Sequence, residues 1–301
     1  MLTHFSLHLS GCNVAYLPAE DAWLVPEGED ELHPENYGFQ VFRASDGTLL
    51  RSMPASEPWD IATLAFNPLD GHVYGVATQP LTNMTSTPYI VRVDVLSGET
   101  SVVSPPLGPA GPYPASGIFS DTEPCLAVVG TSAAGKGTLM FVNNRMHLSP
   151  WHRMQEVVSY DVASQALHVL QYPFGILSAL TAWRNASSGR DLLLAMQWPA
   201  VAGGGDDLTP SLVAVDPTET LWAPRLLWKF DSVSLPMPNC MAVGPDGALY
   251  GLLQGADCPP SCFMEQHLLR VDLATGNATT AFYGSMPLFD PPLFSSCRVK
   301  G

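Results

Sequence analysis

Short apolar runs alternate along the chain with turns rich in Pro, Gly and Asp. The segments 64–76 (LAFNPLDGHVYGV) and 241–252 (MAVGPDGALYGL) show this pattern most clearly. Each has a short apolar strand, a Pro-containing turn with Asp-Gly, and a second strand that carries Tyr and then Gly. Because Asp-Gly tolerates the positive φ angles of tight turns, both segments predict β-hairpins.

A third copy of this hairpin stands at 15–25 (AYLPAEDAWLV), where the turn has no glycine. In the alignment, Pro18 takes the place of Pro68, and Trp23 takes the place of Tyr74. In this alignment the turn differs in length by one residue from the turns of the two clear copies.

A second kind of hairpin follows each of the first. Its strand ends in Asp, and a four-residue turn leads to the next strand. The Asp side chain can accept hydrogen bonds from turn amides, which predicts a structural role for it. Successive copies of this Asp are 67, 55 and 56 residues apart. The copies are 90–100 with Asp94, 157–167 with Asp161, 212–222 with Asp216 and 268–278 with Asp272, and a weaker one at 39–50.

Five units of about fifty residues, each with two hairpins, are typical of a β-propeller with four-stranded blades. We therefore expect an all-β chain with one propeller domain over 1–301, with five blades and six as the alternative. The ends of the chain, 1–10 or 287–301, are expected to close the ring. The expected blades are 12–53, 60–103, 116–170, 178–230 and 239–283.

The Leu-Tyr-Gly and Asp-x-x-Thr-Gly patterns resemble the repeats of the NHL and SMP-30/gluconolactonase-like propellers. The segment 236–254 (PMPNCMAVGPDGALYGLLQ) is most similar to a blade start of that group. The resemblance implies a propeller fold, and for a lactonase it implies one divalent metal at the channel mouth. Asp60 and Asn239 are the candidate ligands, and Ca²⁺ or another hard cation is the candidate metal. Cys240 stands where the group has Gly, and no Glu ligand is evident in the first strand.

Charge excludes one class of partner. The chain has 13 Lys and Arg against 28 Asp and Glu, a formal net charge of −15. Nucleic-acid binding needs a basic surface, so no nucleic-acid partner is expected. Since no apolar run reaches 18 residues, no membrane span is expected either.

Three N-glycosylation sequons and an even number of cysteines favour a secreted protein with disulfides. The sequons begin at Asn83, Asn185 and Asn277. A signal peptide is not visible, because MLTHFSLHLSGC has neither a basic region nor a long apolar run. Six cysteines allow fifteen pairings; Cys258 with Cys262 would staple a loop of blade five, and Cys12 with Cys297 would join the ends. The disulfide candidates are Cys12, Cys125, Cys240, Cys258, Cys262 and Cys297.

The segment 126–142 (LAVVGTSAAGKGTLMFV) contains most of a nucleotide-binding P-loop. A P-loop needs Ser or Thr after the Lys, and a helix beginning there. Here Gly137 follows Lys136, and β-branched and aromatic residues come next. We therefore expect a hairpin turn followed by the second strand of blade three.

One loop is a candidate for ligand binding. The segment NNRMHLSPWHRMQE (143–156) lies in blade three, whose spacing from blade two is the longest, and we interpret it as the insertion that adds this length. Long loops on a rigid scaffold often carry binding, although a solvated loop remains the alternative. Its candidate residues are His147, Trp151, His152 and Arg153.

Three functions remain open. The expected channel strands carry small neutral side chains, which favours a non-catalytic binding module for a protein or carbohydrate ligand, with no cofactor. The alternative is a divalent-metal-dependent hydrolase of the lactonase type that uses Asp60 and Asn239. A glycosidase would need a second carboxylate within roughly 5–10 Å of Asp60.

Overall fold

A computed structural model describes the strands of the chain and the turns between many of them. The described residues are 14–27, 37–54, 59–78, 88–107, 126–130, 135–146, 153–172, 174–185, 188–199, 211–219, 222–229, 238–244, 246–257 and 263–287. Of the two segments expected to close the ring, 1–10 lies outside them, and so does 287–301 except for Pro287.

Twenty strands form five four-stranded antiparallel sheets, and the described residues contain no helix. Blade one has β1 (Ala15–Leu17), β2 (Ala22–Glu27), β3 (Gly38–Arg43) and β4 (Leu49–Pro54); blade two has β5 (Asp60–Asn67), β6 (His72–Thr78), β7 (Pro88–Val93) and β8 (Thr100–Val102). Blade three has β9 (Ala127–Val129), β10 (Thr138–Met146), β11 (Arg153–Asp161) and β12 (Ala166–Tyr172); blade four has β13 (Gly175–Arg184), β14 (Asp191–Pro199), β15 (Ser211–Val215) and β16 (Arg225–Lys229). Blade five has β17 (Pro238–Val243), β18 (Ala248–Asp257), β19 (Phe263–Asp272) and β20 (Ala278–Pro287).

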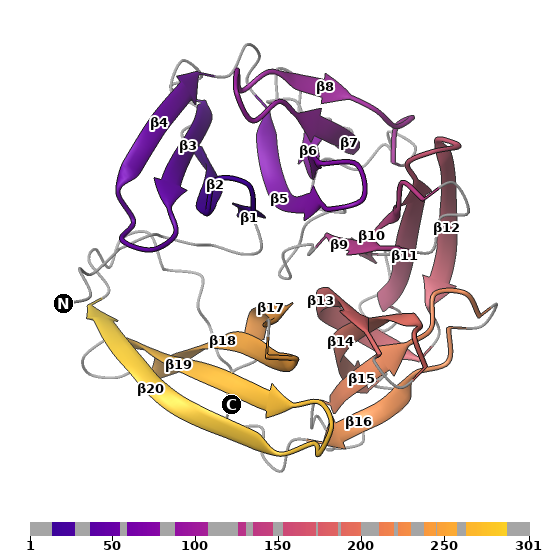
Figure 1. The fold of residues 1–301 in the computed structure, drawn as a ribbon. Coiled ribbons are helices and arrows are strands. Elements are labelled where there is room, and N and C mark those ends of the chain that lie inside the picture. Colours follow the sequence, from indigo (N-terminus) through magenta and orange to yellow (C-terminus); the bar gives the residue numbers. More distant parts are fainter. Residues whose placement is uncertain are drawn as a thin grey trace.

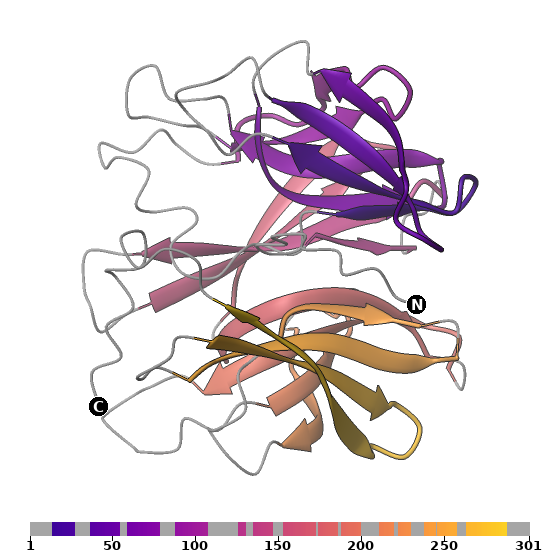
Figure 2. The same ribbon diagram turned by 90° about the vertical axis from the view of Figure 1, so that its left-hand side faces the viewer.

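The sheets stand as blades around a common centre (Figure 1). In every sheet the four strands pair in chain order. The first strand of each blade, β1, β5, β9, β13 or β17, lies nearest the centre, and the last strand lies at the rim (Figure 1). Figure 2 shows the same blades from the side. The prediction of an all-β, five-bladed propeller is confirmed.

Local turn chemistry follows the sequence closely. Gly71 and Gly247 have φ of 77° in the turns after β5 and β17, as the Asp-Gly pattern requires. The Asp94 carboxylate accepts hydrogen bonds from the amides of Leu96 (2.8 Å) and Ser97 (2.9 Å). Turn amides also donate to Asp161, Asp216 and Asp272. The structural role predicted for this repeated Asp is confirmed.

The first hairpin of blade one differs from the predicted alignment. Leu17 pairs with Ala22, so the turn 18–21 has the same length as the turn 68–71 of blade two. Asp21 adopts φ of 48° in this turn, where the other copies have glycine. A left-handed Asp was not expected, because this conformation is uncommon for residues other than glycine.

This register reverses the assignment of two side chains. Leu24, not Trp23, occupies the position of Tyr74, because a shift of one residue moves a side chain to the other face of a sheet. Leu24 is fully buried against blade two. Trp23 lies on the opposite face, where it is 41% exposed and its ring lies 5.0 Å from that of Tyr16.

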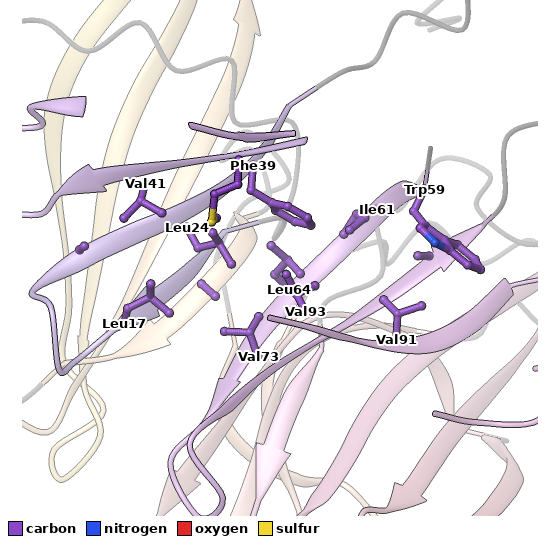
Figure 3. Packing of buried hydrophobic residues seen from close by; sticks show 14 residues of the cluster. Leu17, Leu24, Phe39, Val41, Trp59, Ile61, Leu64, Val73, Val91 and Val93 are labelled. Atoms are coloured by element: carbon purple, nitrogen blue, oxygen red, sulfur yellow. The ribbon is translucent and has the colours of Figure 1, made fainter. Parts of the chain in front are cut away.

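Apolar side chains between neighbouring blades form the core. Leu17, Leu24, Phe39 and Val41 of blade one pack with side chains of blade two such as Leu64 (Figure 3). Three further clusters join blades two and three, three and four, and four and five. A single sheet carries apolar side chains on both faces. Stacking the blades removes from water the apolar side chains that one blade alone would expose.

The second strand of blade three shows that the segment 126–142 does not form a P-loop. β10 begins at Thr138, directly after Gly137, and pairs with β9 and β11. A strand therefore stands where a P-loop needs a helix, and the hairpin prediction is confirmed.

The extra length of blade three lies elsewhere than expected. The pairing of β10 with β11 runs to Met146 and Arg153, which leaves only the connection 147–152 between them. Most of the additional residues stand in 103–126, between β8 and β9. Among the described residues, no helix is long and apolar enough to cross a membrane.

Candidate binding site

The inner strands carry mostly apolar and neutral residues. β1, β5, β9, β13 and β17 contain one carboxylate, Asp60, and one basic side chain, Arg184. Described side chains of these strands, such as Ala127, Leu177 and Met241, are buried in the clusters between blades. The lining strands of the channel thus hold few groups that could transfer protons.

The two candidate metal ligands lie on different blades. Asp60 is the first residue of β5, and Asn239 is the second residue of β17. Because all sheets share one strand order, these two strand beginnings face the same end of the ring. Their side chains are outside what the structure describes, and the metal site stays a prediction.

Most other residues singled out in the sequence fall outside the described side chains. In the candidate loop, His147, Trp151 and His152 are not described, and Arg153 is placed only as the first residue of β11. Asn83 is likewise outside, whereas Asn185 follows β13 and Asn277 lies exposed before β20. Cys240 is placed within β17, with its side chain undescribed. The other cysteines, Cys12, Cys125, Cys258, Cys262 and Cys297, are outside the described ranges.

Blades two and five repeat a group of three polar residues. In blade two, Tyr74 donates a 2.6 Å hydrogen bond to the Asp70 carboxylate, and Arg92 stands opposite Tyr74 on β7. In blade five, Tyr250 donates to Asp246 at 2.9 Å, and Arg270 stands opposite Tyr250 on β19. The shared sequence is Asp-Gly-x-x-Tyr-Gly, followed one strand later by Arg-Val-Asp.

The two groups differ in what the arginine does. Arg270 donates to the Tyr250 hydroxyl (3.2 Å) and pairs with Asp246 (3.2 Å), and its guanidinium lies 6.0 Å from the Tyr250 ring centre. The Arg92 guanidinium has no hydrogen-bond or ion-pair partner among the described residues.

A cavity of about 210 Å³ lies between blades two and three beside Arg92. Its walls bring together three basic residues, two tyrosines, one carboxylate and one amide. They are Asp70, His72, Tyr74 and Arg92 from blade two, Lys136, Tyr160 and Gln165 from blade three, with Val103 and Val162.

Burial raises the pKa of the two tyrosines that line this cavity, so they stay neutral to a higher pH than an ordinary phenol. Desolvation raises the pKa of Tyr74, and its hydrogen bond to Asp70 raises that pKa further. Desolvation also raises the pKa of Tyr160, whose hydroxyl donates to the backbone carbonyl of Val103. Both phenols are therefore neutral donors at physiological pH, and they add no negative charge to the cavity.

A second cavity of about 320 Å³ lies between blades four and five. It is lined by Leu226, Leu227, Trp228 and Val271, with Arg225 and Asp272 at polar positions. Its lining has one cation, Arg225, and no aromatic hydroxyl. The cavity between blades two and three is therefore the better candidate for a polar ligand.

Comparisons with known proteins identify no family. No protein-family model matches the chain, and no curated protein matches it in sequence. An endo-arabinase from Bacteroides thetaiotaomicron is similar in structure, with a TM-score of 0.48 and 10% identity over 95% of this chain and 96% of the other. For the GH43 endo-arabinanase from Bacillus licheniformis the TM-score is 0.47, with 12% identity over 92% of this chain and 100% of the other.

An apocarotenoid oxygenase from Synechocystis is also similar, with a TM-score of 0.45 and 14% identity, over 90% of this chain and 59% of the oxygenase. Likenesses this distant carry no statement about activity. The resemblance to the NHL and SMP-30 group is not confirmed beyond the propeller fold itself.

Sequence reasoning missed the cavity between blades two and three. The repeated Tyr and Arg were a usable signal, because residues opposite each other in a hairpin form cross-strand pairs. Tyr160 and Lys136 could not have been added in this way, since they come from the next blade.

Proposed function

We propose that the chain is a secreted, non-catalytic propeller that binds a protein or carbohydrate ligand. One observation carries the proposal: the five inner strands contain a single carboxylate and a single basic residue, and their described side chains largely pack between blades. Glycosidases need two facing carboxylates, and metal hydrolases need several converging ligands.

Secretion is supported by the sequons and cysteines. Asn277 is exposed beside the β19–β20 turn, where a glycan would meet no core side chain. We propose that glycans on the three sequons and disulfides among the six cysteines belong to the mature protein.

Binding without turnover is the direct test. Purified secreted protein is screened against immobilised glycans and candidate proteins, and any bound oligosaccharide is recovered and analysed by chromatography. We expect saturable binding and intact ligand. Formation of product, abolished by Asp60→Ala, would overturn the proposal.

The second candidate is a metal-dependent lactonase. The observation that favours it is that Asp60 and Asn239 stand at the same end of the ring, where one cation could bridge blades two and five. In this function, lactone hydrolysis requires Ca²⁺ or another divalent cation and is lost in both Asp60→Ala and Asn239→Ala. Hydrolysis that is absent, or unchanged in both variants, would exclude it.

A further inference from the structure

The duplication of Asp, Tyr and Arg in blades two and five gives an internal comparison. Both groups have the same spacing, and both tyrosines donate to their Asp. In blade five the arginine completes the group, because Asp246 and Tyr250 both bind its guanidinium. Blade five thus shows the arrangement in which the Asp, Tyr and Arg side chains form hydrogen bonds with one another.

Blade two departs from this arrangement in one residue. Asp70 accepts from the Tyr74 hydroxyl (2.6 Å) and from the His72 amide (3.0 Å), and no bond joins it to Arg92. Arg92 lines the cavity instead. Among the described residues the guanidinium therefore makes no hydrogen bond, whereas Arg270 at the equivalent place in blade five makes two.

Blade three contributes a second cation to the same cavity. Lys136 is placed there by the β9–β10 turn, whose backbone is held to blade two by the Asn67 side chain. The Lys136 ammonium has no ion-pair partner within the described part of the chain. In a chain with 28 acidic and 13 basic residues, it is unusual for two cations to line one cavity without an ion pair among the described residues.

These side chains define the chemistry of a ligand. Arg92 and Lys136 suit a carboxylate, which a guanidinium can bind through two parallel hydrogen bonds. Asp70 accepts hydrogen bonds, Gln165 can accept and donate, and Tyr74 and Tyr160 are aromatic. Asp70 would repel a second anionic group within the cavity, so the unit bound there must combine one anionic group with hydroxyl donors.

We propose that the cavity between blades two and three binds a carboxylate-bearing sugar unit of an acidic polysaccharide. The carboxylate would bind Arg92 and Lys136, while ring hydroxyls would donate to Asp70 and Gln165. The volume of about 210 Å³ is below the usual range of roughly 300–1,000 Å³ for drug-sized ligands, which suits a single sugar unit. The proposal rests on the proposed binding role and names a ligand class for it.

The test measures binding of an oligogalacturonate hexasaccharide to the full chain by calorimetry at fixed ionic strength. Arg92→Gln and Lys136→Gln are each expected to weaken binding about 10- to 100-fold, as expected for hydrogen bonds to a charged group. Arg270→Gln is the matched control in blade five and should stay within about twofold. Thermal melting of all variants checks that they are folded.

Chemical variants of the probe test the ligand class. The fully methyl-esterified hexasaccharide should not bind, because its carboxylates are neutral. Binding of the ester as strongly as the acid, or equal binding by wild type and Arg92→Gln, would overturn the proposal. Poly-glutamate or a sulfated oligosaccharide that binds more tightly, with the same dependence on Arg92, would overturn the sugar acid as the ligand.

The experiment distinguishes failure of this ligand site from failure of the proposed non-catalytic binding function. Hexasaccharide binding that ignores Arg92 and Lys136 would refute this site and leave a binding module standing. Cleavage of the hexasaccharide would instead refute the non-catalytic function, whatever the variants do.

Discussion

The side-chain amide of Asn67 donates a 2.8 Å hydrogen bond to the backbone carbonyl of Lys136, across the junction between blades two and three. Asn67 is fully buried, and its side-chain oxygen also accepts from the Leu69 amide at 3.0 Å. One side chain therefore closes its own turn and holds the turn of the next blade, which carries Lys136 at the candidate cavity.

Loss of this link should destabilise the fold. Asn67→Ala removes two hydrogen bonds from a buried site, and we expect it to lower the free energy of unfolding by about 1–3 kcal/mol. Urea-induced unfolding measures the change. Glu219→Ala, at an exposed turn, is the control and should stay within about 0.5 kcal/mol of wild type. Equal effects of the two substitutions would show that the link contributes nothing.

The register of blade one predicts opposite outcomes for neighbouring residues. Leu24→Lys would place a charge at a fully buried position, which costs several kcal/mol, so the variant should fail to fold. Trp23→Lys can extend its ammonium to water from the half-exposed face and should remain folded. Circular dichroism and size-exclusion chromatography distinguish the two. If Trp23 were instead the core residue, the outcomes would be reversed.

Completing the P-loop sequence should harm the protein instead of creating a nucleotide site. Gly137→Ser restores the missing residue, yet Gly137 has φ of 82°, and a Cβ there would lie 3.1 Å from Leu69 Cδ1. The left-handed conformation alone costs roughly 1–2 kcal/mol for other residues. We expect a lower melting temperature and no ATP binding by calorimetry. ATP binding by this variant would contradict the hairpin interpretation.

Acid should weaken the fold through the turn carboxylates. Hydrogen bonds from the amides of Ser97 and Leu96 lower the pKa of Asp94, and Arg51 lowers that of Glu20. A lowered pKa in the folded state means that this stabilisation is present above the ordinary carboxyl pKa, about 4, and is lost as the pH falls through the folded value.

Asp94→Asn tests this dependence, because the amide oxygen can still accept from the turn amides but does not titrate. Wild type should be more stable than the variant at pH 7, and the difference should shrink as the pH falls below the ordinary carboxyl pKa and through the lower folded value. Unfolding by urea across this range measures it. A difference that stays constant with pH would contradict the assignment.

Local chemistry explains how much of the fold was predictable. Asp-Gly turns and the strand-ending Asp act within a few residues, so the hairpins and the blade number could be predicted from the sequence. The hairpin of blade one was misaligned because Asp21, not a glycine, adopts the positive φ. The cavity was not predictable, because the packing of two blades, not any local pattern, brings Arg92 and Lys136 together.

The metal content of purified secreted protein, with thermal melting before and after EDTA, tests the non-catalytic function most directly. The account predicts no stoichiometric divalent ion and a melting temperature that EDTA leaves unchanged. One tightly bound ion per chain, whose removal lowers the melting temperature and whose binding is lost in Asp60→Ala and Asn239→Ala, would contradict it and establish the metal site of the alternative function.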